Sequence, residues 1–360
     1  QPFATLFTLY RIVDGLLRLP FWLARSLIPA LRPVRDWTFK QSFTLNTANT
    51  VVDYQSTLGI TPRLSLTPGS EGPRWTILDP FPGSFYRGPL QFSAASHVRP
   101  ATIGGTWHGL SSAPIPDADP VQPSSTSTLA SLTRIALHLH GGAFVTGSGR
   151  DSPDLSGYLG SVLTTSAGFD AAFFPQYRLA GYGGQDPFPA ALQDSLTAWL
   201  YLVRTLGIPA ERITVSGDSA GGNLAIALVR YIEAFGAEGG NDGGDADTIP
   251  RPANLVLLSP WLNPSAVLRS KEVAHSAYRA NPLTLTDYVP FSFLKWGAET
   301  YVAQAESINV QRGGGGAAQG KGNVWTDPLH YDFVTQVPLF LTWAGLEMLS
   351  VDCAKWAERL

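Results

Sequence analysis

The chain has 360 residues, of which 44% are hydrophobic and 15% are charged, a composition typical of a folded globular protein. Basic and acidic residues nearly balance, at 25 against 28, which gives no indication of a nucleic-acid-binding surface. Cys353 is the single cysteine, so an internal disulfide framework is excluded. Together with the absence of an Asn-x-Ser/Thr sequon, this favours a reducing, intracellular compartment.

Residues 1–40 differ in composition from the rest of the chain. They hold six cations against two acids, and four arginines recur at seven-residue spacing, near one face of a helix: Arg11, Arg18, Arg25 and Arg32. Apolar residues lie between them, but no run approaches the roughly 20 residues that span a bilayer. Pro20 and Pro29 predict a break into short helices.

We therefore expect residues 1–60 to form an amphipathic helical cap, followed by a larger domain over residues 61–360. Two interpretations of the cap are open. In one, it covers the substrate-access route and makes peripheral membrane contact through residues 1–40. In the other, it packs on the domain with its arginines in solvent.

Residues 61–130 are rich in Pro, Gly, Ser and Thr. They predict irregular first strands, including 75–78 and 90–92, and a linker around 111–128. From about residue 132, apolar strands alternate with helices. The predicted strands are 135–140, 171–176, 213–216, 255–259 and 339–343, and the predicted helices lie near 152–166, 189–206, 219–235, 284–304 and 348–360. This alternation predicts a mostly parallel twisted sheet with helices on both faces, an α/β fold.

The most informative motif is Gly217-Asp218-Ser219-Ala220-Gly221, which lies between a predicted strand and a predicted helix. In this G-x-S-x-G context the turn is too tight for side chains at its flanks, so both flanks are glycine. The serine hydroxyl is then held exposed at a sheet edge, as an acyl-transfer nucleophile requires. The alternative interpretation of Ser219 is a helix N-cap.

A second motif, His140-Gly141-Gly142-Ala143-Phe144, follows the predicted strand at 135–140. Two glycines after a buried strand allow backbone N–H groups to point into a cleft. The amides of Gly141 and Gly142, with that of Ala220, are therefore candidates to hold a developing oxyanion.

At this point the chain resembles the hormone-sensitive lipase branch of the α/β-hydrolase superfamily, over about residues 130–360. The resemblance rests on the two motifs above and on Tyr177-Arg178-Leu179-Ala180, Phe188-Pro189-Ala190-Ala191-Leu192-Gln193-Asp194, Ser259-Pro260-Trp261 and Asp327-Pro328-Leu329. The family usually has Asp-Tyr-Arg-Leu-Ala-Pro-Glu where this chain reads Gln176-Tyr177-Arg178-Leu179-Ala180-Gly181-Tyr182, a difference in a structural turn.

The resemblance also assigns supporting residues. His140 is expected to shape the oxyanion loop, and Asp218 is expected to be structural. Trp261 and His330 are candidates for the substrate pocket. Arg178 and Asp194 are expected to form buried polar contacts without a chemical role.

A serine nucleophile needs a histidine base and an acid that orients the base, in the chain order Ser, Asp/Glu, His. The family places its acid just after the strand at 339–343, where this chain has Glu347. We favour Glu347 over Asp352, which falls on the following helix. Only thirteen residues follow Glu347, and none is histidine.

Three explanations of the missing histidine are open: a longer enzyme whose remainder lies beyond residue 360 or in a second chain, a shortened pseudoenzyme that binds without catalysis, or a base taken from elsewhere. Without a further strand, residues 339–343 would form an apolar sheet edge. The sequence predicts a serine carboxylic-ester hydrolase acting on apolar, lipid-like esters without metal or organic cofactor. A pseudoenzyme and an acyltransferase are the alternatives.

Overall fold

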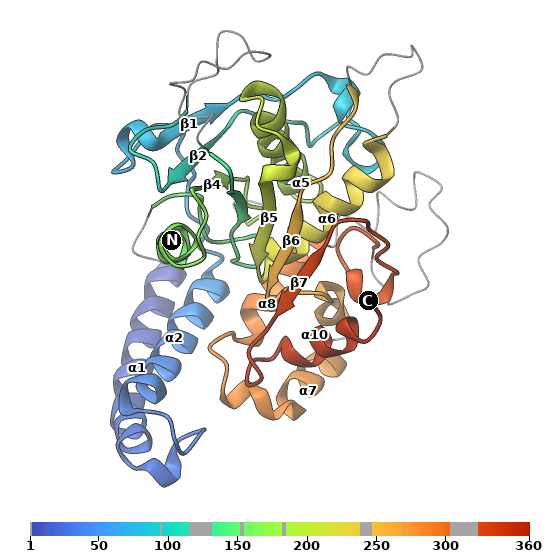
Figure 1. Cartoon of the computed structure of the whole chain (residues 1–360). Helices are drawn as coiled ribbons and strands as arrows, with labels where there is room; N and C mark the ends of the chain where they lie inside the picture. The colour runs from blue at the N-terminus through green and yellow to red at the C-terminus, as the bar shows by residue number, and fades with distance from the viewer. Residues whose placement is uncertain are drawn as a thin grey trace.

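In the computed structural model the described residues are 2–93, 96–114, 132–151, 155–181, 185–237, 247–269, 271–302 and 323–360, with the backbone alone for residues 2–4, 155 and 271. Most of the predicted linker at 111–128 lies outside these ranges. The seven strands are β1 (Trp75–Leu78), β2 (Ile103–His108), β3 (Ile135–Leu139), β4 (Ala171–Gln176), β5 (Ile213–Asp218), β6 (Asn254–Leu258) and β7 (Leu339–Thr342). They form one sheet in the order β1-β2-β4-β3-β5-β6-β7 (Figure 1).

The sheet is mostly parallel, as predicted. Strand β2 runs antiparallel to β1 and β4, and the other neighbours are parallel. The principal helices of the domain are α4 (Leu155–Thr165), α5 (Ala190–Leu200), α6 (Ala220–Phe235), α7 (Lys271–Ala280), α8 (Phe291–Gly297) and α10 (Ser350–Ala357). Helices cover both faces of the sheet, as alternate residues of β4 show. Phe173 belongs to the core cluster that includes α5 and α6, whereas Phe174 packs on the other face with Leu163 of α4. The α/β-hydrolase arrangement is therefore confirmed.

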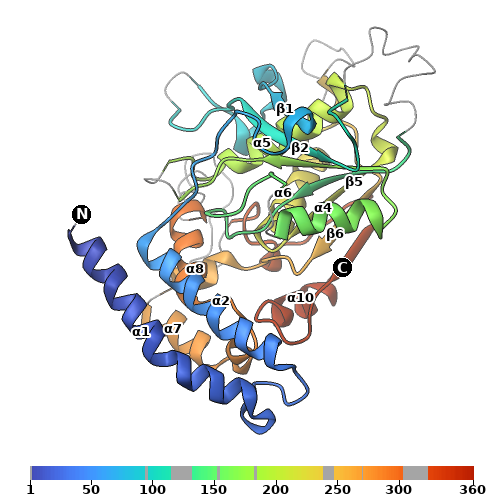
Figure 2. The same cartoon turned by 90° about the vertical axis from the view of Figure 1, so that its left-hand side faces the viewer.

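The N-terminal residues form an antiparallel hairpin of two long helices, α1 (Pro2–Leu27) and α2 (Phe39–Leu58), which projects from the sheet domain (Figures 1 and 2). A capping box between Thr38 and Gln41 begins α2, and Gly59 ends it in the left-handed conformation. The two helices are joined by an ion pair between Arg11 and Asp53 and by stacking of Phe7 on Tyr54.

The expected break at Pro20 is wrong, because α1 continues through it to Leu27. Proline removes one helical hydrogen bond, but contacts with α2 hold the helix on both sides of it. Arg11 pairs with Asp53 before the proline, and Ser26 donates to Ser42 after it. The second proline, Pro29, does lie beyond the end of the helix.

Two further predictions differ from the structure. Residues 90–92 form no strand, and the second strand is instead β2, whose Gly104 and Gly105 are unusual in a strand. Both glycines allow aromatic rings to approach, since a Cβ at Gly104 would lie 1.9 Å from Trp75 and one at Gly105 would lie 2.3 Å from Phe173.

The helix expected at 284–304 is a 3-10 turn, then α8, then a π turn at Ala298–Val302.

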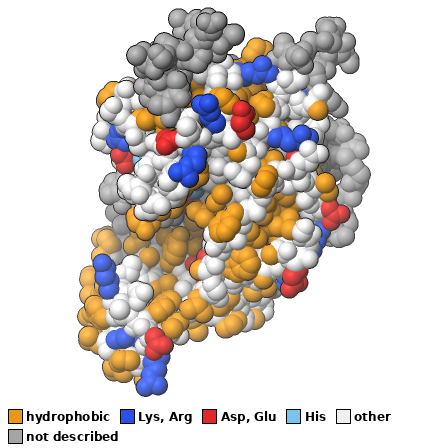
Figure 3. Space-filling view, in the orientation of Figure 1, with side chains coloured by type: hydrophobic (Ala, Val, Ile, Leu, Met, Phe, Trp, Pro, Cys, Tyr) orange, Lys and Arg blue, Asp and Glu red, His pale blue; other side chains and the backbone are white. Residues whose placement is uncertain are grey.

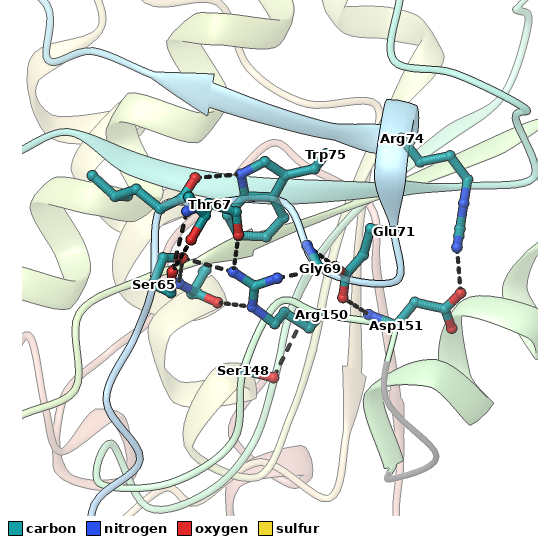
Figure 4. Close-up of polar contacts among 11 residues, drawn as sticks. Ser65, Thr67, Gly69, Glu71, Arg74, Trp75, Ser148, Arg150 and Asp151 are labelled. Atoms are coloured by element: carbon teal, nitrogen blue, oxygen red, sulfur yellow. Dashed lines mark hydrogen bonds and ion pairs between the residues drawn. The ribbon is translucent and has the colours of Figure 1, made fainter.

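Arg150 connects the segment after the cap to the loop that begins at His140 (Figure 4). Its guanidinium donates to Glu71 at 2.9 Å and to the carbonyls of Ser65 and Thr67 at 2.7 and 2.8 Å, and it lies 4.1 Å above the Trp75 ring. Charge-assisted hydrogen bonds of this kind are about twice as strong as neutral ones. This network fixes the irregular chain at 65–75 against the sheet.

Strand β7 is at one edge of the described sheet, where it pairs with β6. Its burial alternates along the strand, and Phe340 is 60% exposed. The predicted apolar edge at residues 339–343 is thus present among the described residues.

Candidate active site

Ser219 lies on a sharp turn between β5 and α6. Its backbone adopts φ 51° and ψ −118°, a conformation that costs a non-glycine residue of order 1–3 kcal/mol. The turn is held on both sides, because the Ser219 amide donates to the Leu258 carbonyl at 3.0 Å and its carbonyl accepts from the Trp261 amide at 2.9 Å. The predicted strand–turn–helix context of the motif is therefore confirmed.

The flanking glycines are required by close backbone contacts. A Cβ at Gly217 would lie 2.3 Å from the Gly221 carbonyl oxygen, and one at Gly221 would lie 2.0 Å from the carbonyl oxygen of Leu139. Both distances are too short for a side chain. The second contact also shows that the serine turn packs directly on the end of β3, where the loop that begins at His140 starts.

His140 and Asp218 hold the loop that follows β3. The His140 ring stacks on Tyr177 with centroids 4.1 Å apart, and its Nδ1 lies 2.7 Å from the Gly141 carbonyl. Asp218 Oδ1 accepts from the Gly141 amide at 2.8 Å and lies 3.2 Å from Nε2 of the buried His138. Both residues thus make contacts that position the loop against the serine turn.

The amide of Gly141 is already hydrogen-bonded to Asp218, so it does not fit its expected role as an oxyanion donor. The residues after Gly141 have left-handed backbone conformations, and two of their amides make no hydrogen bond to any described residue. Gly142 has φ 117°, and Ala143 and Phe144 both have positive φ values of 52° and 63°. Within the described part of the chain, neither the Gly142 amide nor the Ala143 amide donates a hydrogen bond.

A cavity of about 430 Å³ lies in front of Ser219, within the usual range of small-molecule sites. Four parts of the chain line this cavity: the loop that begins at His140, the serine turn, the cap and the segment around α8. The lining residues include Gly141, Gly142, Ala143, Ser219, Trp261, Tyr288, Phe293, Val52 and Ile60. Most of the exposed lining is apolar. The cap contributes to this lining through Val52 and Gln55 of α2 and through Ile60, which follows the helix.

Glu347 lies beside Ser219 in a second cavity of about 250 Å³, which is also lined by Ser259, Asp287, Tyr288 and Leu349. Burial raises the pKa of Glu347, against hydrogen bonds from the Ser259 hydroxyl and the Ala344 amide. The structure therefore brings the predicted nucleophile and the predicted acid to one space. Asp352 lies outside this lining, on α10.

None of the six histidines lines either cavity that contains Ser219. The side chain of His330 lies 3.0 Å from Asn263 Oδ1 and lines neither cavity, whereas Trp261, the other pocket candidate, lines the larger one. His138 is fully buried between Ser216 and Asp218. In the described ranges, no group of three His, Cys, Asp or Glu residues is placed to hold a metal ion.

Asp287 is a site residue that the sequence analysis missed. It is 8% exposed and lines both cavities. Its carboxylate accepts from the amides of Val289 and Met348 at 2.9 and 2.8 Å. It thereby ties the segment before α8 to the loop that carries Glu347, and no sequence motif marks this contact.

The Asp287→Asn variant is expected to lose less stability than the wild type as pH rises. Burial raises the pKa of Asp287 above its ordinary value, so the folded state binds this proton more tightly than the unfolded state does. Its contribution to stability is complete below the unfolded pKa, about 4, and is lost as pH rises through the raised value. Urea unfolding of both proteins at a series of pH values would measure this, and parallel pH profiles would contradict it.

A family model described as alpha/beta hydrolase fold matches residues 136–360. An acetyl-hydrolase of Streptomyces hygroscopicus is 34% identical over 226 residues, which are 63% of this chain and 61% of the relative. Human hormone-sensitive lipase is 28% identical over 138 residues, covering 37% of this chain and 11% of the lipase. The chain thus spans about three fifths of the first relative's length and about a tenth of the second's.

Among solved structures, an esterase from the bacterial hormone-sensitive lipase family is similar at 20% identity and a TM-score of 0.47, covering 88% of this chain and 82% of that one. The family match spans more than half of the chain and includes both the His140 loop and the Ser219 turn. The chain therefore belongs to this family of the alpha/beta hydrolase fold.

Proposed function

We propose that this protein is a serine carboxylic-ester hydrolase that acts through an acyl-enzyme on apolar esters. The observation that carries the proposal is Ser219 on its strained turn, facing an apolar cavity of about 430 Å³. Strained backbone at a cavity is typical of functional sites. The names of relatives such as an acetyl-hydrolase and a hormone-sensitive lipase agree with ester chemistry.

In the proposed reaction, the Ser219 hydroxyl oxygen bonds to the ester carbonyl carbon as a histidine base takes the hydroxyl proton, a role that none of the six histidines of residues 1–360 is placed to fill. The carbonyl oxygen becomes an oxyanion. The same proton then passes to the leaving alcohol as the carbon–oxygen ester bond breaks, and water hydrolyses the acyl-enzyme by the reverse roles. Glu347 is the residue that would orient the histidine, because both carboxylate and nucleophile border the cavity of about 250 Å³.

We assign the oxyanion donors to the amides of Gly142, Ala143 and Ala220. Gly141 is not among the proposed donors, because its amide already donates a hydrogen bond to Asp218. Ala220 is the first residue of α6, so its amide has no acceptor within the helix and lies at the positive end of the helix dipole. Backbone donors fixed in this way stabilise charge that develops in the transition state.

Substituting Gly142 with alanine is expected to lower kcat by about 100- to 1000-fold, the cost of losing one oxyanion donor. The residue has φ 117°, and an added Cβ would lie 2.2 Å from the Thr146 carbonyl oxygen. The loop must therefore shift. Steady-state kinetics on a nitrophenyl ester would measure the loss.

Gly15→Ala is the matched control for Gly142→Ala, because a Cβ at Gly15 meets nothing within 4 Å. It should leave kcat unchanged. Wild-type kcat in Gly142→Ala would contradict the assignment of the donors.

The function is tested by turnover of nitrophenyl esters of increasing acyl length by the full-length protein. We expect hydrolysis, with KM falling as the acyl chain grows, because a longer chain covers more of the apolar lining. A folded full-length protein that binds such an ester without turnover would overturn the hydrolase proposal and support a binding protein. Transfer of the acyl group to an added alcohol in preference to water would identify an acyltransferase.

A further inference from the structure

The outer face of α1 is apolar and exposed along the helix. The residues that share this face follow helical spacing and include Leu6, Leu9, Tyr10, Val13, Leu16, Leu17 and Leu27, which are 53–75% exposed. No charged residue falls between them on that face. With about 1.5 Å of rise per residue, the 26 residues of α1 present an apolar stripe along the whole hairpin.

The polar residues of α1 lie on the opposite side. Arg11 pairs with Asp53 of α2 and is 16% exposed, and Thr8 is hydrogen-bonded to Tyr54. The expectation of arginines in solvent therefore does not hold for Arg11, whereas Arg18 is 54% exposed and pairs with Asp14 of the same helix. The helix thus turns Thr8 and Arg11 toward α2 and its apolar face outward, whereas an ordinary surface helix buries its apolar face.

The turn between the two helices adds charge to this apolar surface. Leu31 is 52% exposed and Phe39 is 38% exposed, and the cations Arg35 and Lys40 are exposed beside them. Residues 1–40 hold six cations against two acids in a chain whose formal net charge is −3. Orange side chains gather over this hairpin in the space-filling view (Figure 3).

We propose that the outer face of α1, with the turn to α2, docks on an anionic lipid surface. An exposed apolar helix face accompanied by basic and aromatic residues is the pattern of helices that lie in a membrane interface, and basic residues at one end match the phosphates of anionic lipids. No helix in the described ranges is both long and apolar enough to cross a bilayer, so α1 would lie along the surface.

This docking would also supply substrate to the proposed esterase, and in that respect it rests on the proposed function. A groove of about 590 Å³ begins at the same turn and is lined by Trp37, Lys40, Gln41, Thr44, Leu45, Ala48 and Tyr288. Tyr288 also lines both cavities beside Ser219. The groove and the two cavities therefore meet at Tyr288, which places the proposed lipid contact next to the cavities that Ser219 lines.

The test is co-sedimentation of the full chain with phosphatidylcholine vesicles and with mixed phosphatidylcholine–phosphatidylserine vesicles. We expect binding to both, tighter to the mixed vesicles. The triple variant Leu9→Gln, Val13→Gln, Leu17→Gln should bind at least about tenfold more weakly, because it removes three apolar contacts from the face. Arg35→Gln with Lys40→Gln should remove the preference for phosphatidylserine.

A matched control replaces three exposed valines elsewhere, Val273, Val334 and Val351, with glutamine, and should bind as the wild type does. Circular dichroism checks that each variant is folded. Wild-type binding by the α1 variant, or no binding by the wild type, would overturn the proposal. A dimer that the α1 variant converts to monomer would assign the face to a second copy. Ser219→Ala should bind vesicles normally, so that failure of docking and failure of catalysis can be told apart.

Discussion

Ser219→Ala is expected to lower kcat/KM for a nitrophenyl ester by about 10⁴- to 10⁶-fold, the range found when a serine nucleophile is removed. Alanine keeps the Cβ that the turn already accommodates at φ 51°, so only the hydroxyl is lost. The fold, the oxyanion loop and the cavity should therefore be unchanged. Initial rates over a range of ester concentrations, with thermal unfolding of both proteins, would measure the two effects separately.

Ser161→Ala is the matched control for this substitution. Ser161 is an exposed residue of α4 and lines neither cavity beside the nucleophile. Its rates should equal those of the wild type. If Ser219→Ala retained full activity while folded, another group would be the nucleophile and the proposed acyl-enzyme would be excluded.

Arg178→Met is expected to lower the free energy of unfolding by about 3–5 kcal/mol, the usual cost of leaving a buried charge without its partner. The Arg178 guanidinium donates to both oxygens of Asp194, at 2.9 and 2.8 Å. The Asp194 side chain is fully buried, and methionine fills much of the same space without a donor. Denaturant unfolding at neutral pH would measure the loss.

Arg251→Met provides the comparison for Arg178→Met. Arg251 also pairs with a carboxylate, Glu233, but its side chain is 45% exposed. Because solvent screens the exposed guanidinium, this pair should contribute only roughly 0–1 kcal/mol, so the variant should unfold nearly as the wild type does. If the two variants lost equal free energy of unfolding, burial of Asp194 would not explain the loss in Arg178→Met.

The same ion pair also supports the site. Arg178 follows β4, and residues on either side of it hold the oxyanion loop. The Tyr177 hydroxyl donates to the His140 carbonyl at 2.6 Å, and the Ala180 amide donates to the Phe144 carbonyl at 2.8 Å. We therefore expect any activity that remains in Arg178→Met to be reduced as well.

The elements that depend on local pattern could be predicted from the sequence. The apolar runs at β3 to β7 and the glycines around Ser219 could be read directly, because strand burial and a tight turn each impose residue types on consecutive positions. The tight serine turn and the resemblance to the alpha/beta hydrolase superfamily followed from those residues. Strand β2 could not be found in this way, since its Gly104 and Gly105 are explained only by the aromatic rings of neighbouring strands.

Which side chains and backbone groups come into contact at the site could be learned only from the folded chain. That the Gly141 amide bonds to Asp218, that Asp287 holds the Glu347 loop, and that α1 turns its leucines outward all depend on contacts between segments far apart in the chain. Local spacing fixes which residues share a helix face, but not which face is buried. The buried face of α1 depends on its contacts with α2. The carboxylate of Asp53 pairs with Arg11, so the polar side at Arg11 faces α2 and the apolar face of α1 points away from it.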